Sequence, residues 1–290
     1  MAIAGVVRDL RRVIPEATIV VVDNGSGDAT AERALSVGAE VIVEARRGKA
    51  HAVLAGFAHI EADLIVMIDG DGSYPAEGVA QLLDAYAANP CDMITGVRKA
   101  SDPRTAYRPL HRFGSAVFAL VFRLVFNHEP RDLFSGLRVF TKRFYKNVPI
   151  LFRGFELETE LTVQAIDKRF SVSEVDVSFG QRAPGSSSKL RTVSDGLRIL
   201  RLLFVLFRDY RPLVFFGVLA SLFFVAGLLA GLLPIYEYVT TRMVGRFPLA
   251  ILAAALMNLS LFTLLTGVML ESSLRHRRES YQIALRNYRP

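Results

Sequence analysis

One stretch decides how this 290-residue chain folds: Ala62-Asp63-Leu64-Ile65-Val66-Met67-Ile68-Asp69-Gly70-Asp71-Gly72-Ser73-Tyr74-Pro75. Its apolar run has the length of a strand and is bounded by turn residues, which predicts a β-strand buried on both faces. Open α/β sheets bind ligands beyond the carboxyl ends of such strands, and here this strand leads into Asp69 and Asp71. Two carboxylates one residue apart suit a divalent cation that also binds substrate phosphates. The pair also has a simpler interpretation, because Asp and Gly are ordinary turn residues.

Strands and helices alternate through the first part of the chain. We expect strands at residues 18–22, 40–43, 64–68, 92–95, 139–141 and 171–179, and helices at 3–13, 29–36, 50–59 and 76–88. The fourth strand is expected to end before the tripeptide Gly96-Val97-Arg98. Such alternation predicts an α/β fold with a largely parallel sheet and right-handed crossovers.

Two apolar segments follow near the C-terminus, at residues 213–236 and 247–270. Neither contains Asp, Glu, Lys or Arg. Each is long enough to cross a hydrocarbon core of about 30 Å as a helix. Two core helices of a soluble domain would both have to be apolar on every face, so we expect two transmembrane helices instead.

The net charge of +7 belongs to the membrane part of the chain. Residues 189–290 hold 13 of the 35 Lys and Arg residues but only 5 of the 28 Asp and Glu residues, so they carry +8 and leave −1 for residues 1–188. Cations that flank membrane spans set topology and attract anionic lipids. Membrane lipids are therefore the expected partner, and a nucleic acid is not.

The distribution of arginines predicts the topology of the two spans. Several arginines precede the first span and several follow the second, whereas the connection between them carries only Arg242 and Arg246. By the positive-inside rule the spans form a two-pass hairpin with both termini in the cytoplasm. The single Cys91 excludes an internal disulfide, and in the absence of a visible signal peptide the first span is expected to direct targeting.

Two further segments combine apolar residues with arginines. Residues 110–126 are too short and too charged to span a membrane, which predicts an interfacial or substrate-covering helix. Residues 191–211 have the pattern of an amphipathic helix on the membrane surface. A third helix opens near Phe155 with Glu156, Glu158 and Glu160, and acidic residues in a first turn commonly complement the helix dipole.

Several motifs stand in a recognisable order: Val22 to Ser26, Asp69-Gly70-Asp71, Gly96-Val97-Arg98, Asp132 to Arg138, Phe155 to Glu160, and Arg182 with Ser188-Lys189. As a set they resemble family 2 glycosyltransferases, in the branch of dolichol-phosphate mannose synthases and polyprenyl-phosphate glucosyltransferases. The resemblance covers about residues 1–211. It implies a Rossmann-like GT-A domain with a mostly parallel mixed sheet at 1–190, the interfacial helix at 191–211, and a transmembrane hairpin with a basic tail at 212–290.

The resemblance also assigns roles to single residues. It implies that Asp23, Lys49, Asp69 and Arg182 bind the nucleotide sugar, and that Asp69 and Asp71 bind Mg²⁺ or Mn²⁺. It places Arg98, Arg112, Ser115 and Arg182 around the lipid phosphate. Asp71, Asp132 and Arg98 are the expected catalytic residues. The arginines could instead be surface charges or bilayer contacts, and Asp132 could cap a loop.

The implied function is metal-dependent, inverting transfer of a sugar from a UDP- or GDP-linked donor. The implied acceptor is a polyprenyl phosphate of the dolichyl or undecaprenyl type at the cytoplasmic face, in cell-envelope or glycan biosynthesis. Two alternatives stay open: a catalytically silent relative that binds nucleotide sugar or lipid, and a transferase with a glycan or protein acceptor. The sugar and the oligomeric state are also open, a homo-oligomer included.

Two departures from the family pattern bear on these expectations. Ser73 stands where many relatives carry a Gln that assists the metal, so metal affinity or choice is expected to differ. The chain also begins in the helix that normally follows a first strand and a Pro-X-X-Asn-Glu loop. Without that strand, an inner strand would be unpaired on one side. Part of the wall that binds the nucleotide base would also be missing. Either Met1 is a misplaced start or the protein is an impaired relative.

Overall fold

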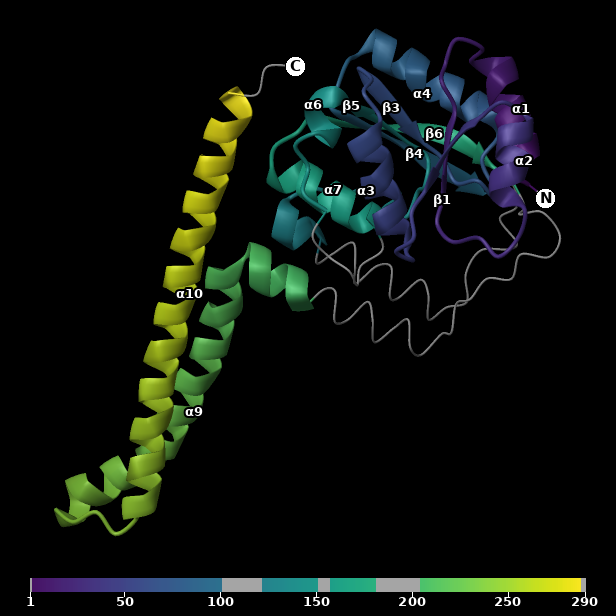
Figure 1. The fold of residues 1–290 in the computed structure, drawn as a ribbon. Coiled ribbons are helices and arrows are strands. Elements are labelled where there is room, and N and C mark those ends of the chain that lie inside the picture. Colours follow the sequence, from purple (N-terminus) through teal and green to yellow (C-terminus); the bar gives the residue numbers. More distant parts are fainter. Residues whose placement is uncertain (1, 101–121, 151–156, 181–203, 288–290) are drawn as a thin grey trace. The chain divides into compact units, whose positions relative to one another are not determined.

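The computed structural model describes residues 2–100, 122–150, 157–180 and 204–287 (Figure 1). They belong to two compact units. One is an α/β unit, mainly residues 1–113 and 129–190, and the other is a helical unit, mainly residues 191–284. The predicted residues Arg112, Ser115 and Arg182, and most of the helices expected at 110–126 and 191–211, lie outside the described residues.

Strands and helices alternate in the described part of the α/β unit, which confirms the predicted fold class. The helices are α1 (Ile3–Val13), α2 (Thr30–Ser36), α3 (Lys49–His59), α4 (Ala76–Ala88), α6 (Lys142–Tyr145) and α7 (Leu157–Asp167). The strands are β1 (Val20–Asp23), β2 (Glu40–Val43), β3 (Leu64–Met67), β4 (Met93–Ala100), β5 (Arg138–Thr141) and β6 (Val172–Phe179).

The strands form two hydrogen-bonded groups. Strands β1 and β2 pair in parallel, and the other four have the order β3-β5-β4-β6. Strand β5 is antiparallel to both of its neighbours, whereas β4 and β6 are parallel. The sheet is therefore mixed, and β5 brings the loop that precedes it to the edge where β3 ends.

Strand β4 is longer than the sequence predicted, which corrects one expectation. Gly96, Val97 and Arg98 lie inside the strand, because pairing with β6 continues without interruption from Met93 to Ala100. Glycine is needed here for packing: a Cβ at Gly96 would lie 3.0 Å from Cγ2 of Val177. Arg98 is consequently held by the sheet.

The two faces of β5 pack against different layers, since successive side chains of a strand point to opposite sides. Leu137 and Val139 belong to the apolar core beneath α1 and α4. Phe140 points the other way and meets Phe57 of α3, with ring centroids 5.4 Å apart. Arg138 shares that second face and reaches α7. A charged side chain is thus placed at a fully buried position.

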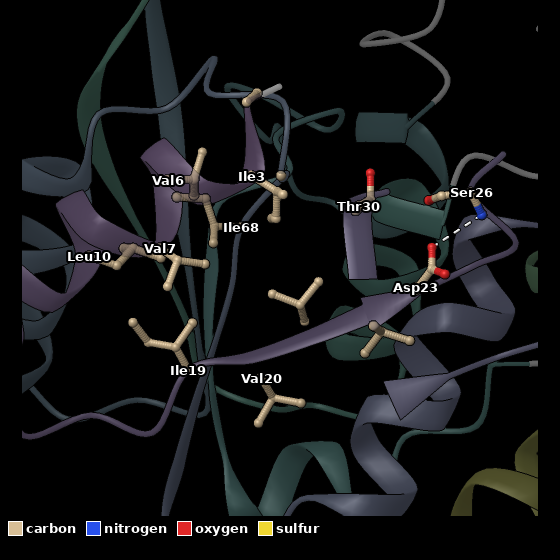
Figure 2. Close-up of a pocket in the computed structure, with 14 residues that line it drawn as sticks. Ile3, Val6, Val7, Leu10, Ile19, Val20, Asp23, Ser26, Thr30 and Ile68 are labelled. Carbon is tan, nitrogen blue, oxygen red and sulfur yellow. Dashed lines mark hydrogen bonds between the residues drawn. The ribbon is translucent and has the colours of Figure 1, made fainter. Parts of the chain in front are cut away.

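Strands β1 and β3 have unpaired edges among the described strands. Each has one hydrogen-bonded neighbour, and they do not pair with one another. A cavity of about 330 Å³ is lined by α1, by β1, and by Ile68 and Gly70 just beyond β3 (Figure 2). Most of the residues that line it are aliphatic, and Asp23, Ser26 and Thr30 form its polar end.

The helical unit contains two helices that are long and apolar enough to cross a membrane: α9 (Pro212–Thr241) and α10 (Phe247–Asn287). The most apolar 18-residue windows have mean hydropathies of 2.6 and 2.1, yet only 11% and 6% of these windows are buried in the chain. Core helices of a soluble protein would be mostly buried. The second helix runs past the predicted span 247–270 because its charged continuation is also helical.

Small residues let the two long helices approach closely, as is common in membranes. Ser260 on α10 donates a hydrogen bond to the carbonyl oxygen of Ala220 on α9, at 2.8 Å. A Cβ on Gly227 would lie 3.2 Å from Cγ of Met257. At the tip, Arg246 pairs with Glu237, with Nε and Oε1 3.1 Å apart. These contacts make the pair a helical hairpin.

This packing predicts that Gly227→Leu destabilises the hairpin, because the new side chain must enter space that α10 fills. Overpacking of this kind costs about 1–3 kcal/mol. Thermal unfolding in detergent, followed by circular dichroism, measures the effect. Gly217→Leu is the matched control on the same helix, since nothing lies within 4 Å of a Cβ there. Equal melting temperatures for the two variants would refute the close approach at Gly227.

Candidate active site

The acidic pair Asp69 and Asp71 follows β3 at the edge of the sheet. Its turn is held by Asp71, whose Oδ1 accepts a hydrogen bond from the backbone N–H of Ser73 at 2.9 Å. Gly72 has a φ of 76°, which an L-amino acid rarely adopts. The two carboxylates are thus presented by a short, internally bonded turn.

Lys49, the first residue of α3, binds one of these carboxylates. Its Nζ lies 2.5 Å from Oδ1 of Asp69 and also donates to Oε1 of Glu158 on α7. Burial lowers the pKa of Lys49, but the negative charges of Glu158 and Asp69 outweigh that effect and leave the pKa raised. Lys49 is therefore an ammonium ion between two carboxylates.

Glu158 is a member of this cluster that the sequence analysis missed. Its acidic neighbourhood was expected to complement the dipole of α7, but Glu158 is only 6% exposed and binds Lys49. The sequence held part of the signal that Glu158 belongs to the site, because Glu158 lies in the motif Phe155 to Glu160. Nothing in the sequence alone showed that a residue 109 positions away would pair with it.

The loop before β5 lies against Asp69. A Cβ on Gly136 would be 2.1 Å from Oδ2 of Asp69, so only glycine fits there without displacing the carboxylate. The hydroxyl of Tyr74 accepts a hydrogen bond from the backbone N–H of Gly136 at 2.9 Å and lies 3.2 Å from Oγ of Ser135. Both oxygens of Asp69 thus have defined neighbours.

Arg138 braces the same loop from inside. It donates to the carbonyl oxygens of Ser135 and Leu133, both at 3.0 Å, and to Oγ1 of Thr162 on α7 at 2.9 Å. Complete burial lowers its pKa to about 10, partly offset by the charge of Glu158. Since Arg138 ties the loop to α7, it fixes Gly136 and Glu158 relative to one another.

Arg98 and Asp132 form a separate, two-pronged ion pair. Nε and Nη2 of Arg98 donate to the two carboxylate oxygens of Asp132 at 2.7 and 2.9 Å, and the backbone N–H of Arg98 adds a third bond at 3.1 Å. Planar guanidinium groups favour this geometry with carboxylates. The predicted pair of catalytic residues is therefore brought into direct contact.

Strand β1 ends at Asp23, and Asn24 follows it directly. Asp23 accepts a hydrogen bond from the backbone N–H of Ser26 at 3.1 Å and lies at the polar end of the cavity (Figure 2). The side chain of Asn24 bonds the carbonyl oxygens of Glu44 and Arg46 and accepts from the N–H of Gly48 at 2.6 Å. Asn24 thereby fixes the loop that leads into Lys49.

The arrangement fits a cation that is shared with substrate phosphates. Among the described residues no three His, Cys, Asp or Glu side chains gather around one point, so Asp69 and Asp71 would supply two carboxylates and the rest would come from elsewhere. Hard oxygen ligands of this kind suit Mg²⁺ or Mn²⁺, which commonly combine one or two carboxylates with phosphate oxygens and water.

Comparison with known proteins identifies the class. Residues 2–148 match the family described as glycosyl transferase family 2. Glycosyltransferase AglJ of Haloferax volcanii is 30% identical over 264 residues, which are 91% of this chain and 86% of that protein. A dolichyl-phosphate hexose transferase of the same organism is 27% identical, covering 68% of this chain and 85% of that protein.

The fold agrees with this match. Glucosyl-3-phosphoglycerate synthase from Mycobacterium tuberculosis, solved with Mn²⁺, UDP-glucose and phosphoglyceric acid, aligns with a TM-score of 0.55 at 17% identity. The alignment covers 71% of this chain and 74% of that one, and it shows a common GT-A fold. The chain belongs to glycosyltransferase family 2.

Proposed function

We propose that this chain transfers a sugar from a nucleotide-sugar donor to a polyprenyl phosphate. The observation that carries the proposal is the acidic pair at the end of β3, with cationic groups close by, in a chain that also has two helices able to span a membrane. Two relatives support it by name, one a glycosyltransferase and one a dolichyl-phosphate hexose transferase. A lipid-linked acceptor explains why a transferase domain would be anchored.

The donor diphosphate would be held through a cation at Asp69 and Asp71. When bound, Mg²⁺ or Mn²⁺ supplies positive charge that stabilises the leaving diphosphate. The structural neighbour that was solved with Mn²⁺ and UDP-glucose supports this use of a metal within the fold. In this chain Lys49 adds an ammonium beside Asp69, and Asp23 is the proposed nucleotide contact at the end of β1.

The acceptor needs little activation. A phosphate monoester has a second pKa near 6, so at neutral pH it is largely dianionic and already nucleophilic. The protein must therefore gather anions more than remove a proton. Arg98, with Arg112, Ser115 and Arg182, is the proposed phosphate-binding set, and Asp132 orients Arg98 through its two hydrogen bonds. In-line attack at the anomeric carbon predicts inversion.

The proposed location is the cytoplasmic membrane face, with α9 and α10 as a two-pass anchor. Their exposed apolar surface supports membrane insertion, and arginines near both ends of the pair support cytoplasmic termini. Nucleotide sugars are cytoplasmic compounds in this scheme, so the donor and the α/β unit would share one compartment.

Transfer of label into lipid tests the proposal. Membranes that contain the chain are incubated with radiolabelled UDP- and GDP-sugars, and the organic-extractable fraction is counted. We expect label there from one donor, released by mild acid as a phosphate-linked sugar should be. Label that stays in glycan or protein would contradict the polyprenyl acceptor and favour the alternative acceptor.

One observation favours a second candidate, a catalytically silent relative that binds nucleotide sugar or lipid. Among the described strands, β1 and β3 each have an unpaired edge beside the cavity, next to the proposed nucleotide contact Asp23. A sheet edge without a neighbouring strand at this point would lower the affinity for a nucleotide. A silent relative would bind donor or lipid in a filter assay but move no label from any donor.

A further inference from the structure

We propose that Glu158 is a positioning residue that draws Lys49 off Asp69 and so makes room for the cation. This rests on the proposed function, because it assumes that a divalent cation binds at Asp69. Nothing in the family comparison assigns a role to Glu158.

Both oxygens of Asp69 have close neighbours in the present arrangement. Oδ1 accepts from the ammonium of Lys49 at 2.5 Å. Oδ2 lies so close to Gly136 that a Cβ there would be 2.1 Å away. Because the backbone on that side is tied to Tyr74 and Arg138, the Oδ2 side cannot open easily. A cation that binds Asp69 therefore approaches Oδ1 and competes there with the ammonium of Lys49.

Glu158 gives the displaced ammonium a second partner. The side chain of Glu158 is 8% exposed and that of Lys49 is 40% exposed, so the carboxylate is the fixed member of the pair and the lysine the movable one. Lys49 already donates to both acids. Leaving Asp69 costs it one hydrogen bond, and the ammonium stays neutralised by the other.

Without Glu158, Lys49 would have Asp69 as its partner in this cluster. The ammonium would then compete with the cation for a single carboxylate, and the attraction between opposite charges at this distance is strong in a partly buried site. The charge of Glu158 thus lowers the cost of metal binding mainly by acting on Lys49. This indirect effect can be measured.

A double-mutant cycle on Mn²⁺ binding tests the inference. The dissociation constant for Mn²⁺ is measured on purified full-length protein in detergent by electron paramagnetic resonance, without donor. Lys49→Met should tighten binding on the order of tenfold, because the competing charge is gone. Glu158→Gln should weaken it several-fold in the presence of Lys49. In the Lys49→Met background the same Glu158→Gln change should have a much smaller effect.

Other outcomes are decisive as well. If Glu158→Gln weakens Mn²⁺ binding equally in both backgrounds, the carboxylate acts directly on the metal and the inference is wrong. Glu61→Gln, which removes an equal charge from an exposed pair with Lys146, controls for net charge and should change nothing. The variant with both Lys49→Met and Glu158→Gln leaves no buried charge unpaired. Its Mn²⁺ affinity can therefore be measured even if Lys49→Met alone lowers the melting temperature. Absence of Mn²⁺ binding by the unaltered protein would overturn the inference, and lipid labelling would then show separately whether transfer proceeds.

Discussion

Replacing Asp71 by Asn is expected to reduce sugar transfer by at least about a hundredfold, the range for loss of a principal electrostatic group in an active site. The amide keeps an oxygen that can accept the Ser73 N–H, so the turn after β3 should persist. What is lost is the negative charge that binds the cation. Transfer of labelled sugar and Mn²⁺ affinity should fall together.

The matched control is Asp63→Asn. Asp63 immediately precedes the same strand at its other end, is exposed, and takes part in the fold through its backbone carbonyl, which accepts from Lys142. This variant should transfer sugar at the unaltered rate. Full activity in purified Asp71→Asn protein that remains inserted in the membrane would remove Asp71 from the proposed mechanism.

Gly136→Ala is expected to have the second large effect. The added methyl group would lie 2.1 Å from Oδ2 of Asp69, which no real contact allows, so the carboxylate or the loop must move. The loop is bonded to Tyr74 and braced by Arg138, and the carboxylate is therefore the part that gives way. We expect Mn²⁺ affinity and transfer to drop by tenfold to a hundredfold, as when a metal-supporting contact is lost.

Gly5→Ala controls for this change. Gly5 lies in α1 with nothing within 4 Å of a Cβ, and alanine is the better helix former there. Its transfer rate should be unchanged and its melting temperature equal or slightly higher. If Gly136→Ala proved as active as Gly5→Ala, the close contact between the loop and Asp69 would not exist in the working protein.

Local patterns in the sequence predicted most helices and strands of the α/β unit. The apolar run before Asp69 predicted β3, and the spacing of apolar residues predicted α1 with the bounds that the structure has. The predicted end of β4 at Thr95 was wrong, because only the pairing with β6 shows that Gly96 lies within the sheet. Strand length depends on a neighbour that is remote in sequence.

The candidate site was predicted in part. Asp69 and Lys49 were named, and the structure brings them into contact, as it does Arg98 and Asp132. Glu158, Gly136 and Arg138 were not assigned to the site, because their importance comes from tertiary contacts: one is a buried carboxylate, one a missing Cβ and one a buried cation. No local pattern distinguishes these from a helix-dipole acid, a turn glycine or a surface arginine.

The most direct test of the central claim uses purified protein in lipid nanodiscs with a defined polyprenyl phosphate, Mn²⁺ and each candidate nucleotide sugar in turn. Mass spectrometry of the lipid fraction measures the product. The account predicts a lipid heavier by one sugar residue with one donor, absent when Asp71→Asn protein is used. Unchanged lipid with every donor, from protein that still binds the nucleotide, would contradict it and identify a silent member of the family.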